Sequence, residues 1–280
     1  MSEAALLDGV GAAEVPRTFV TVTGPDAVSF LQGQLSQDVE AMDAGGSALS
    51  FLLHPQGKVV ALLRVTRLDD DVVLLDTDGG LARVLVDRLE RFKLRVKADI
   101  TVAPWRCISV RGSERPEGVA GLPSLWPDWP GVDVFGESPP PLPDGIAACT
   151  PEEMEVARII RGVPRSGVEI DDRTIPAETG LVDRAVSFTK GCYTGQELVA
   201  RIDSRGHVNR HLRRLTMTGG PGAVPAPGTT VESGDKEVGV LTSAAWSTTR
   251  EVVVALGYVR REVDPGREVT VAGAAARVEP

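Results

Sequence analysis

The order of strand and helix signals over residues 17–110 restricts the fold more than any other feature of the sequence. Alternating apolar and polar side chains mark strands, apolar residues three and four apart mark helices, and Gly and Pro mark turns. In order, we predict a strand at 17–23, a helix opened by Gly24-Pro25-Asp26, strands at 48–53, 59–66 and 72–77, a helix at 81–93 and a strand at 100–110. The second and third strands should form a hairpin. This order favours an α+β fold, with an antiparallel or mixed sheet and its helices on one side, over a doubly wound parallel sheet.

A proline-rich stretch follows these elements. Residues 116–143 contain eight prolines, a density that prevents continuous helices and strands. We therefore predict an irregular surface connection, which Trp126 and Trp129 are expected to hold against the body of the protein.

The last 130 residues give two further signals. Thr150 and Glu153 have capping-box spacing with Pro151 between them, which predicts a helix start; the residues expected to face inward are Met154, Ala157 and Ile160. From about residue 206, short β-rich stretches alternate with Gly, Pro and Ser. We expect a small, barrel-like all-β domain over 206–280 and a separate α+β part over 1–205.

Charge and composition exclude several classes of protein. The formal net charge is −9, and few aromatic residues are available to stack on bases, so a direct nucleic-acid binder is disfavoured. The first ten residues lack the basic and apolar regions of a signal peptide, and no later run has the roughly 20 apolar residues of a membrane span. We expect a cytoplasmic protein. The three cysteines, Cys107, Cys149 and Cys192, are too widely spaced to indicate a disulfide framework or a zinc site.

The segment from Lys190 to Glu197, KGCYTGQE, carries the strongest chemical signal. Thr194 and Glu197 have capping-box spacing, so a helix is expected to begin at Gly195. Cys192 would then precede a helix N-terminus, and the helix dipole and the Lys190 ammonium would both favour its thiolate. The alternative is that Cys192 is a buried, inert small side chain. The two interpretations are about equally supported before any family is considered.

Three further side chains of this region suit a heterocyclic or amide ligand. Tyr193 offers a flat face and a hydroxyl, and Gln196 and Glu197 offer hydrogen-bond acceptors. Beyond them, five arginines and one acid lie between residues 201 and 214, a patch that could hold an acidic ligand or be a solvated surface; they are Arg201, Arg205, Arg210, Arg213 and Arg214, with Asp203. His207 and His211 are four residues apart but have no evident third ligand, so no metal site is proposed.

KGCYTGQE resembles the signature of the YgfZ-type folate-binding proteins, relatives of the glycine-cleavage aminomethyltransferase, at every fixed position. Four weaker strings extend the resemblance through most of the chain: FLQGQLSQDV at 30–39, LLHPQGKV at 52–59, RFKLRVK at 91–97 and ARIIRGVPRSGVEI at 157–170. The resemblance implies two α+β lobes and a C-terminal β-barrel around a folate-shaped channel. It also implies binding of tetrahydrofolate or a derivative, and a role in maintaining iron-sulfur enzymes, including those that thiolate tRNA.

Carried over residue by residue, the resemblance makes Cys192 the functional thiol at the channel rim and Lys190 its electrostatic partner. It places Tyr193, Gln196, Glu197 and Arg201 around the ligand. One position departs from the family pattern, because Ile160 stands where relatives commonly have the Glu that suits a pair of pterin donors. Glu169 or Glu178 would have to take its place.

The resemblance leaves the activity open. The leading expectation is a folate-binding accessory protein of iron-sulfur cluster assembly or repair, whose partners are iron-sulfur enzymes or assembly proteins. One alternative is a folate-dependent aminomethyltransferase, but Arg83 occupies the position of the Asp that such enzymes use, and Asp76, Asp78 and Asp87 are predicted to be turn or helix-surface residues. A second alternative is a non-catalytic module that docks protein partners.

Overall fold

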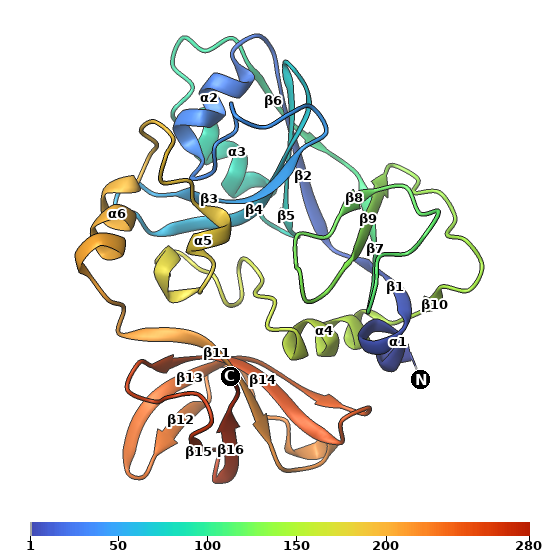
Figure 1. Cartoon of the computed structure of the whole chain (residues 1–280), viewed down its shortest axis with the longest axis vertical. Helices are drawn as coiled ribbons and strands as arrows, with labels where there is room; N and C mark the ends of the chain where they lie inside the picture. The colour runs from blue at the N-terminus through green and yellow to red at the C-terminus, as the bar shows by residue number, and fades with distance from the viewer. Residues whose placement is uncertain (1) are drawn as a thin grey trace.

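The protein consists of two α+β lobes and a C-terminal barrel, and the structure, a computed structural model, describes residues 2–280 (Figure 1). Each lobe contains a five-stranded sheet, and the barrel closes six strands on themselves. The predicted α+β class and the C-terminal barrel are both confirmed. The helix α4 lies between the second lobe and the barrel, so it contacts both units.

The first lobe is an antiparallel sheet with two helices on one face. Its strands, in the order in which they lie in the sheet, are β3 (Ser47–Leu53), β4 (Val59–Asp69), β5 (Val72–Asp78), β2 (Arg17–Thr23) and β6 (Asp99–Ala103); its helices are α2 (Ala27–Gln34) and α3 (Ala82–Glu90). Leu31 of α2 and Leu89 of α3 are fully buried in the same cluster as Val20 and Leu75 of the sheet. Both helices therefore cover one face, as predicted, and the β3–β4 hairpin is confirmed.

The predicted single strand at 100–110 is wrong, because this stretch forms two strands in two different sheets. β6 pairs with β2 in the first lobe, whereas β7 (Arg106–Gly112) pairs with β1 (Val10–Val15) in the second lobe. Pro104 lies between them and lacks the backbone N–H that a continuous ladder would need. The chain thus leaves one sheet and enters the other at this proline.

The second lobe contains elements that the sequence analysis did not identify. Its strands in spatial order are β10 (Ala147–Ala148), β1, β7, β9 (Gly131–Gly136) and β8 (Leu122–Pro123), and the N-terminal helix α1 (Ser2–Asp8) packs beside it. The prediction of an irregular connection is wrong for β9, which lies between β7 and β8 inside the proline-rich stretch. Trp129 is buried and its indole N–H donates to the Leu6 carbonyl at 2.9 Å, so it pins this stretch as expected.

The helix α4 (Pro151–Ile160) has the predicted start. The Thr150 hydroxyl accepts from the Glu153 backbone N–H at 3.2 Å, and the Glu153 carboxylate accepts from the Thr150 N–H at 2.8 Å. The predicted inward-facing residues are buried: Met154, Ala157 and Ile160. They share a cluster with Leu256 of the barrel, so α4 joins the second lobe to the barrel through apolar contacts.

The segment after α4 returns to the first lobe before the barrel begins. It contains the short helices η1 (Pro176–Glu178) and α5 (Val182–Ala185) and the longer α6 (Gln196–Arg205). Tyr193 and Val199 pack with Leu49 and Leu62 of the first sheet in one buried cluster. This packing holds α6 on the side of the first lobe that lies away from β1 and α1 (Figure 1).

The barrel begins at Arg210, close to the predicted boundary. Its strands in chain order are β11 (Arg210–Met217), β12 (Thr230–Ser233), β13 (Lys236–Ser247), β14 (Val252–Arg260), β15 (Glu268–Val271) and β16 (Ala274–Val278), with the short helix η2 (Pro221–Ala223) between β11 and β12. Val231, Leu241 and Val271 are among the side chains that fill its interior. Glu3 of α1 accepts hydrogen bonds from Ser247 and Thr248, which ties the N-terminal helix to the barrel.

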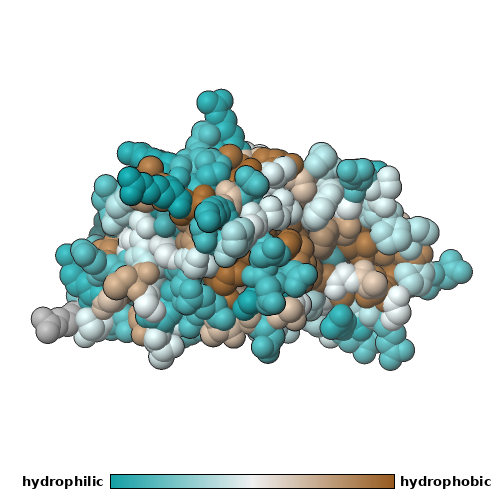
Figure 2. Space-filling model, turned by 90° about the horizontal axis from the view of Figure 1, so that it is seen from above, coloured by the Kyte–Doolittle hydropathy of each residue, from teal (hydrophilic) through white to brown (hydrophobic). Residues whose placement is uncertain are grey.

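The face of the molecule seen in Figure 2 carries many hydrophilic side chains, with apolar side chains interspersed. The large apolar residues that are exposed include Leu94, at 82%, and Phe188, at 50%. Among residues 2–280, no helix is both long enough and apolar enough to cross a bilayer.

Candidate functional site

A large cavity lies where all three units meet. Its volume is about 880 Å³, within the usual range for pockets that hold small-molecule ligands. The first lobe contributes Arg17, Arg64 and Asp78; the second lobe contributes Ser109, Arg111, Trp126, Trp129 and Asp133; α4 and the loop after it contribute Met154, Glu155 and Arg165; the barrel contributes Trp246. We call this space the central cavity.

A chain of buried ion pairs forms one wall of the central cavity and joins the two lobes. Arg17 of β2 and Arg64 of β4 both pair with Asp76 of β5, the latter at 2.7 Å. Arg64 also reaches Asp133 of β9 at 2.9 Å, and Asp133 pairs with Arg111 of β7 at 2.8 Å. Since each carboxylate is shared by two guanidinium groups, all five charges depend on one another.

The charges of this network shift the pKa values of its members. Burial by itself raises the pKa of Asp133, but Arg111 and Arg64 outweigh it and hold that pKa well below its usual range. Burial by itself lowers the pKa of Arg17, but Asp76 and the other nearby carboxylates outweigh burial and raise this pKa above its usual value. Asp133 and Arg17 are therefore ionised at neutral pH.

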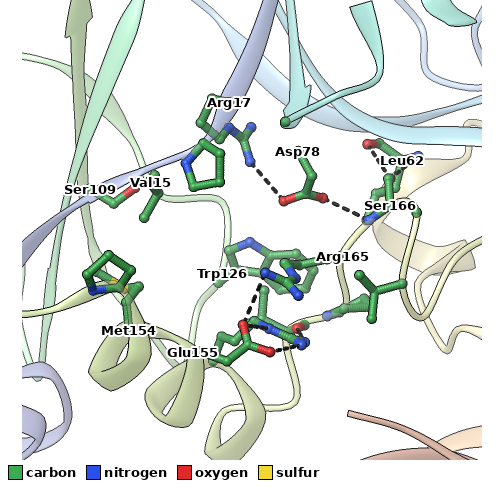
Figure 3. A pocket seen from close by; sticks show the side chains of 18 of the residues that line it. Val15, Arg17, Leu62, Asp78, Ser109, Trp126, Met154, Glu155, Arg165 and Ser166 are labelled. Carbon is green, nitrogen blue, oxygen red and sulfur yellow. Dashed lines mark hydrogen bonds and ion pairs between the residues drawn. The ribbon is translucent and has the colours of Figure 1, made fainter. Parts of the chain in front are cut away.

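Asp78 brings one further carboxylate into the central cavity (Figure 3). It lies 3.7 Å from Arg17 and accepts a hydrogen bond from the Ser166 backbone N–H at 2.8 Å. Burial raises the pKa of Asp78, and Arg17 and Ser166 offset this only in part. An acid in this state can accept from an amine or amide of a ligand, and it can donate when protonated.

The opposite side of the central cavity combines aromatic rings with an ion pair. Figure 3 shows Trp126 between Asp78 on one side and Glu155 and Arg165 on the other. Arg165 pairs with Glu155 at 3.2 Å. The Nε atoms of Arg165 and of Arg17 are buried and have no hydrogen-bond partner within residues 2–280. These two donors are available to a ligand acceptor, and Trp126 offers it a flat apolar face.

Most of these residues were missed or misread in the sequence analysis. Asp76 and Asp78 were predicted to be turn residues, which is wrong, because both belong to β5 and Asp76 is fully buried. The usable signal was their spacing of two within an apolar strand, which puts both side chains on the same face. Arg83 and Asp87 are surface residues that pair with each other on α3 at 3.3 Å, so neither reaches the central cavity.

The KGCYTGQE segment forms a loop on the first lobe, and we call Lys190–Gly195 the cysteine loop. The Lys190 ammonium donates to three backbone carbonyls, of Gln32, Leu35 and Gln37, at 2.6, 2.8 and 2.8 Å. These carbonyls belong to the C-terminal end of α2 and the residues just after it, where unpaired carbonyls favour a cation. Lys190 thus fastens the cysteine loop to α2.

The expected electrostatic role of Lys190 toward Cys192 stays a prediction, because the hydrogen bonds of the Lys190 ammonium go to backbone carbonyls. An ammonium has three donors, and all three are occupied by carbonyls. Burial lowers the pKa of Lys190 to about 8, against the opposing charges of Asp38 and Glu40. Cys192 itself is exposed to solvent, so the alternative expectation that it is buried is wrong.

The helix after the cysteine loop begins almost as predicted, but without the predicted capping box. α6 starts at Gln196 with Gly195 as its N-cap, and no side chain caps it. The Thr194 hydroxyl lies instead at hydrogen-bond distance from Gly33 and Gln34 of α2, and the Thr194 N–H donates to the Gly33 carbonyl at 3.0 Å. Thr194 therefore adds a second link between the cysteine loop and α2.

The remaining predicted site residues divide into loop supports and exposed groups. Tyr193 is buried beneath Lys190, whose Nζ lies 5.2 Å from the ring centroid, and burial raises the pKa of Tyr193 to about 12. The Gln196 side chain accepts from the Tyr193 N–H at 3.2 Å. Glu197 and Arg201 are exposed on α6. None of these four described residues lines the central cavity, and neither do Lys190 and Cys192, so Cys192 is not at the cavity rim.

The glutamates expected to replace the missing carboxylate at Ile160 have other partners. Glu169 is buried and accepts from Arg158 at 3.0 Å and from Ser243 at 2.5 Å. Glu178 pairs with Arg210 at 2.8 Å. Ile160 is itself buried in the apolar cluster between α4 and the barrel. None of the three lines the central cavity, whose carboxylates are those of Asp78, Asp133, Glu152 and Glu155.

The predicted arginine patch at 201–214 is dispersed by the fold. Arg210 is engaged by Glu178 and lies over the Tyr258 ring, Arg214 contacts α4, and Arg201 is exposed on α6. The side chain of Arg205 lies outside the described part of the structure. Within the described residues, no group of three or more His, Cys, Asp and Glu side chains could hold a metal ion.

Comparison with known proteins identifies relatives of this chain. Residues 210–279 match the family model of the glycine cleavage T-protein C-terminal barrel domain. The whole chain superimposes on the aminomethyltransferase T of the glycine cleavage system from Bartonella henselae with a TM-score of 0.84 at 18% sequence identity, covering 100% of this chain and 87% of that one. This second likeness establishes the fold.

Sequence similarity to individual proteins identifies the relatives of the chain more specifically than the fold does. The chain is 30% identical over 196 residues to an uncharacterized protein of Haemophilus influenzae, covering 69% of this chain and 68% of that protein. It is 27% identical to the tRNA-modifying protein YgfZ of Vibrio vulnificus, covering 81% and 72%. It is 30% identical to the mitochondrial iron-sulfur cluster assembly factor IBA57 homolog of Neurospora crassa, covering 76% of this chain and 55% of the fungal protein. The match thus spans little more than half of that fungal relative.

Proposed function

Because the chain belongs to the YgfZ-type family, which is related to the glycine cleavage aminomethyltransferase, we propose that it is a folate-binding accessory protein of iron-sulfur cluster assembly or repair. The relatives named for iron-sulfur cluster assembly and for tRNA modification support the cellular role. The central cavity carries the ligand proposal, since it combines a volume of about 880 Å³ with two unpartnered arginine Nε atoms, a carboxylate and aromatic walls.

The residues of the central cavity fit the chemistry of a reduced folate. A pterin ring carries an amine and N–H donors, which suit the Asp78 carboxylate, and its flat face suits Trp126. The glutamate end of a folate carries carboxylates, which suit the free Nε atoms of Arg17 and Arg165. Asp78 and the arginines would thus orient the ligand, while the tryptophans would exclude water from it. When bound, the reduced pterin supplies a one-carbon carrier and a reductant.

The proposed functional thiol is Cys192, on a different part of the first lobe. A single thiolate cannot hold a cluster, because iron-sulfur clusters generally have four protein ligands, so a partner protein would supply the others. Tyr193 packs in the same buried cluster as Leu49 and Leu62, which also line the central cavity. This contiguous packing offers a physical route by which an occupied cavity could stiffen the cysteine loop.

Two experiments test the proposal, one for each part. In cells that lack the protein, Cys192→Ala should fail to restore the activity of iron-sulfur enzymes, whereas Cys149→Ala, which changes a partly buried thiol, should restore it. Equal activity of the two variants would remove Cys192 from the mechanism. For the ligand, 5-formyltetrahydrofolate at about 100 times its Kd should add about 2.7 kcal/mol to the free energy of unfolding. Absence of any thermal shift would contradict folate binding and favour the alternative that the protein is a non-catalytic module that docks protein partners.

A second function, folate-dependent one-carbon transfer, is favoured by one observation. Asp78 lies in the central cavity with a raised pKa, and such enzymes need a carboxylate at the folate nitrogen. Purified protein should then form methylenetetrahydrofolate from tetrahydrofolate and a protein-bound aminomethyl donor, and Asp78→Asn should abolish the reaction. Lack of turnover by the wild type would exclude this second function, and the accessory role would then be the remaining proposal.

A further inference from the structure

A second pocket lies where the end of α4 meets the barrel, apart from the central cavity and the cysteine loop. Its volume is about 470 Å³. Four arginines line it, and we call it the arginine pocket; they are Arg161, Arg213, Arg214 and Arg250. Its acidic groups are the side chains of Asp128 and Glu279 and the carboxylate of Pro280, so arginines outnumber acidic groups by one in a protein whose net charge is −9.

The acidic side chains of the arginine pocket do not neutralise its arginines. Glu279 is engaged by the Thr216 hydroxyl at 2.5 Å. Among the described residues, no ion pair joins Asp128 or Glu279 to any of the four arginines, although ion pairs are frequent elsewhere in the fold. Arg161, Arg213 and Arg250 therefore have no ion-pair partner among the described residues, whereas Arg214 lies beside the Pro280 carboxylate.

Backbone carbonyls hold two of the guanidinium groups in place. Arg214 donates to the carbonyl of Ile160 at 3.1 Å and to a carboxylate oxygen of Pro280, the last residue of the structure, at 2.7 Å. Arg161 donates to the Leu7 carbonyl at 2.6 Å, and its Nε is buried without a hydrogen-bond partner among residues 2–280. A carbonyl orients a guanidinium but leaves its charge in place, so the pocket is preorganised for an anion that also pairs with the free Nε.

The other lining residues narrow the class of ligand. Ile160, Leu212 and Leu256 are aliphatic, and no aromatic side chain lines the pocket, so a nucleotide base has no ring on which to stack. A volume of about 470 Å³ lies within the range of pockets that bind small ligands, so the pocket can hold a small polyvalent ion. We propose that the arginine pocket binds a small oligoanion, whose phosphate or carboxylate groups pair with Arg161, Arg214 and Arg250.

The proposal is tested by isothermal titration calorimetry on the full chain at low, fixed ionic strength in a buffer free of phosphate. One arm uses sodium tripolyphosphate and the other uses tetra-γ-glutamate, neither of which contains a pterin ring. Saturable binding of tripolyphosphate alone would identify phosphate as the source of the anion, and binding of tetra-γ-glutamate alone would identify carboxylate. Binding of both supports the shared anion chemistry, and absence of saturable binding in both arms overturns the proposal.

Variants assign the binding to this pocket. Arg250→Gln changes an exposed side chain, and we expect it to weaken binding about tenfold. Arg161→Gln should do the same, and its melting temperature shows whether the fold is retained. Arg83→Gln is the matched control, since it removes the same charge from an exposed helix of the first lobe. Equal weakening by Arg83→Gln and Arg250→Gln would mean non-specific attraction and would overturn the proposal.

Discussion

Gly195 lies directly against the carbonyl oxygen of His54, and a Cβ placed on Gly195 would be 2.5 Å from that oxygen. The relationship is mutual, because a Cβ on Gly57 would be 2.4 Å from the Cβ of Leu198 in α6. The β3–β4 turn and the start of α6 are therefore packed backbone to backbone. Together with the contacts of Lys190 and Thr194 to α2, this packing brings three separate sequence strings, FLQGQ, HPQG and KGCYTGQE, to one place.

Gly195→Ala should consequently destabilise the protein strongly. Gly195 has a φ of +84°, where an L side chain is strained, and the added methyl group would collide with the His54 carbonyl. We expect a loss of about 2 kcal/mol or more in the free energy of urea unfolding. Gly191→Ala is the control, because nothing lies within 4 Å of its Cβ position. Similar stabilities of the two variants would refute the proposed packing.

Lys190→Met should lower stability but leave the chemistry of Cys192 unchanged. The substitution leaves three carbonyls without their donor, which should cost about 1–3 kcal/mol of unfolding free energy. The rate at which iodoacetamide alkylates Cys192 should stay within about twofold of the wild type, since the ammonium does not bond to the thiol. Unchanged stability with much slower alkylation would show that Lys190 activates the thiol after all.

Asp133→Asn should disrupt the buried network between the lobes. Asp133 is the shared partner of Arg64 and Arg111, so the variant leaves two buried guanidinium groups short of a counter-charge. A loss of about 3–5 kcal/mol is expected from chemical denaturation. The control is Glu14→Gln, which breaks the exposed pair with Arg106 and should have little effect. If both variants unfold at the same denaturant concentration, the network does not hold the lobes together.

The pH dependence of stability should report on Asp78. Its folded-state pKa is raised by burial, so between the unfolded-state value of about 3.9 and that raised value the folded protein binds more protons than the unfolded chain. Stability therefore falls as pH rises through this window. Asp78→Asn lacks this contribution. The free energy of unfolding of the variant should therefore rise relative to that of the wild type as pH increases from about 4. A constant difference between the two at every pH would mean that the pKa of Asp78 is not raised.

Local patterns predicted the first lobe, α4 and the barrel well, because alternation, helical spacing and capping residues are local features. Two of the errors in the predicted strands have a physical reason. β9 lies in a proline-rich stretch, but its six residues, Gly131–Gly136, contain no proline and pair with β7. β6 and β7 form one apolar run in the sequence, and only the tertiary structure shows that they belong to different lobes.

The candidate site was harder to predict than the fold. The motif marked an exposed cysteine, but the sequence did not show that Lys190, Tyr193 and Gln196 contact other parts of the protein and hold the loop. The central cavity is built from residues such as Arg17, Asp78 and Trp126 that are far apart in the chain and belong to different units. No spacing rule reveals such a convergence, because it depends on how the two lobes and the barrel pack together.

The central claim, that a reduced folate binds among Asp78 and the tryptophans and away from Cys192, is tested most directly by tryptophan fluorescence. Three of the four tryptophans, Trp126, Trp129 and Trp246, line the central cavity. Titration with 5-formyltetrahydrofolate should quench the emission saturably, equally well in Cys192→Ala, and about tenfold more weakly in Asp78→Asn. Absence of saturable quenching, or quenching that is lost in Cys192→Ala and unchanged in Asp78→Asn, would contradict the account.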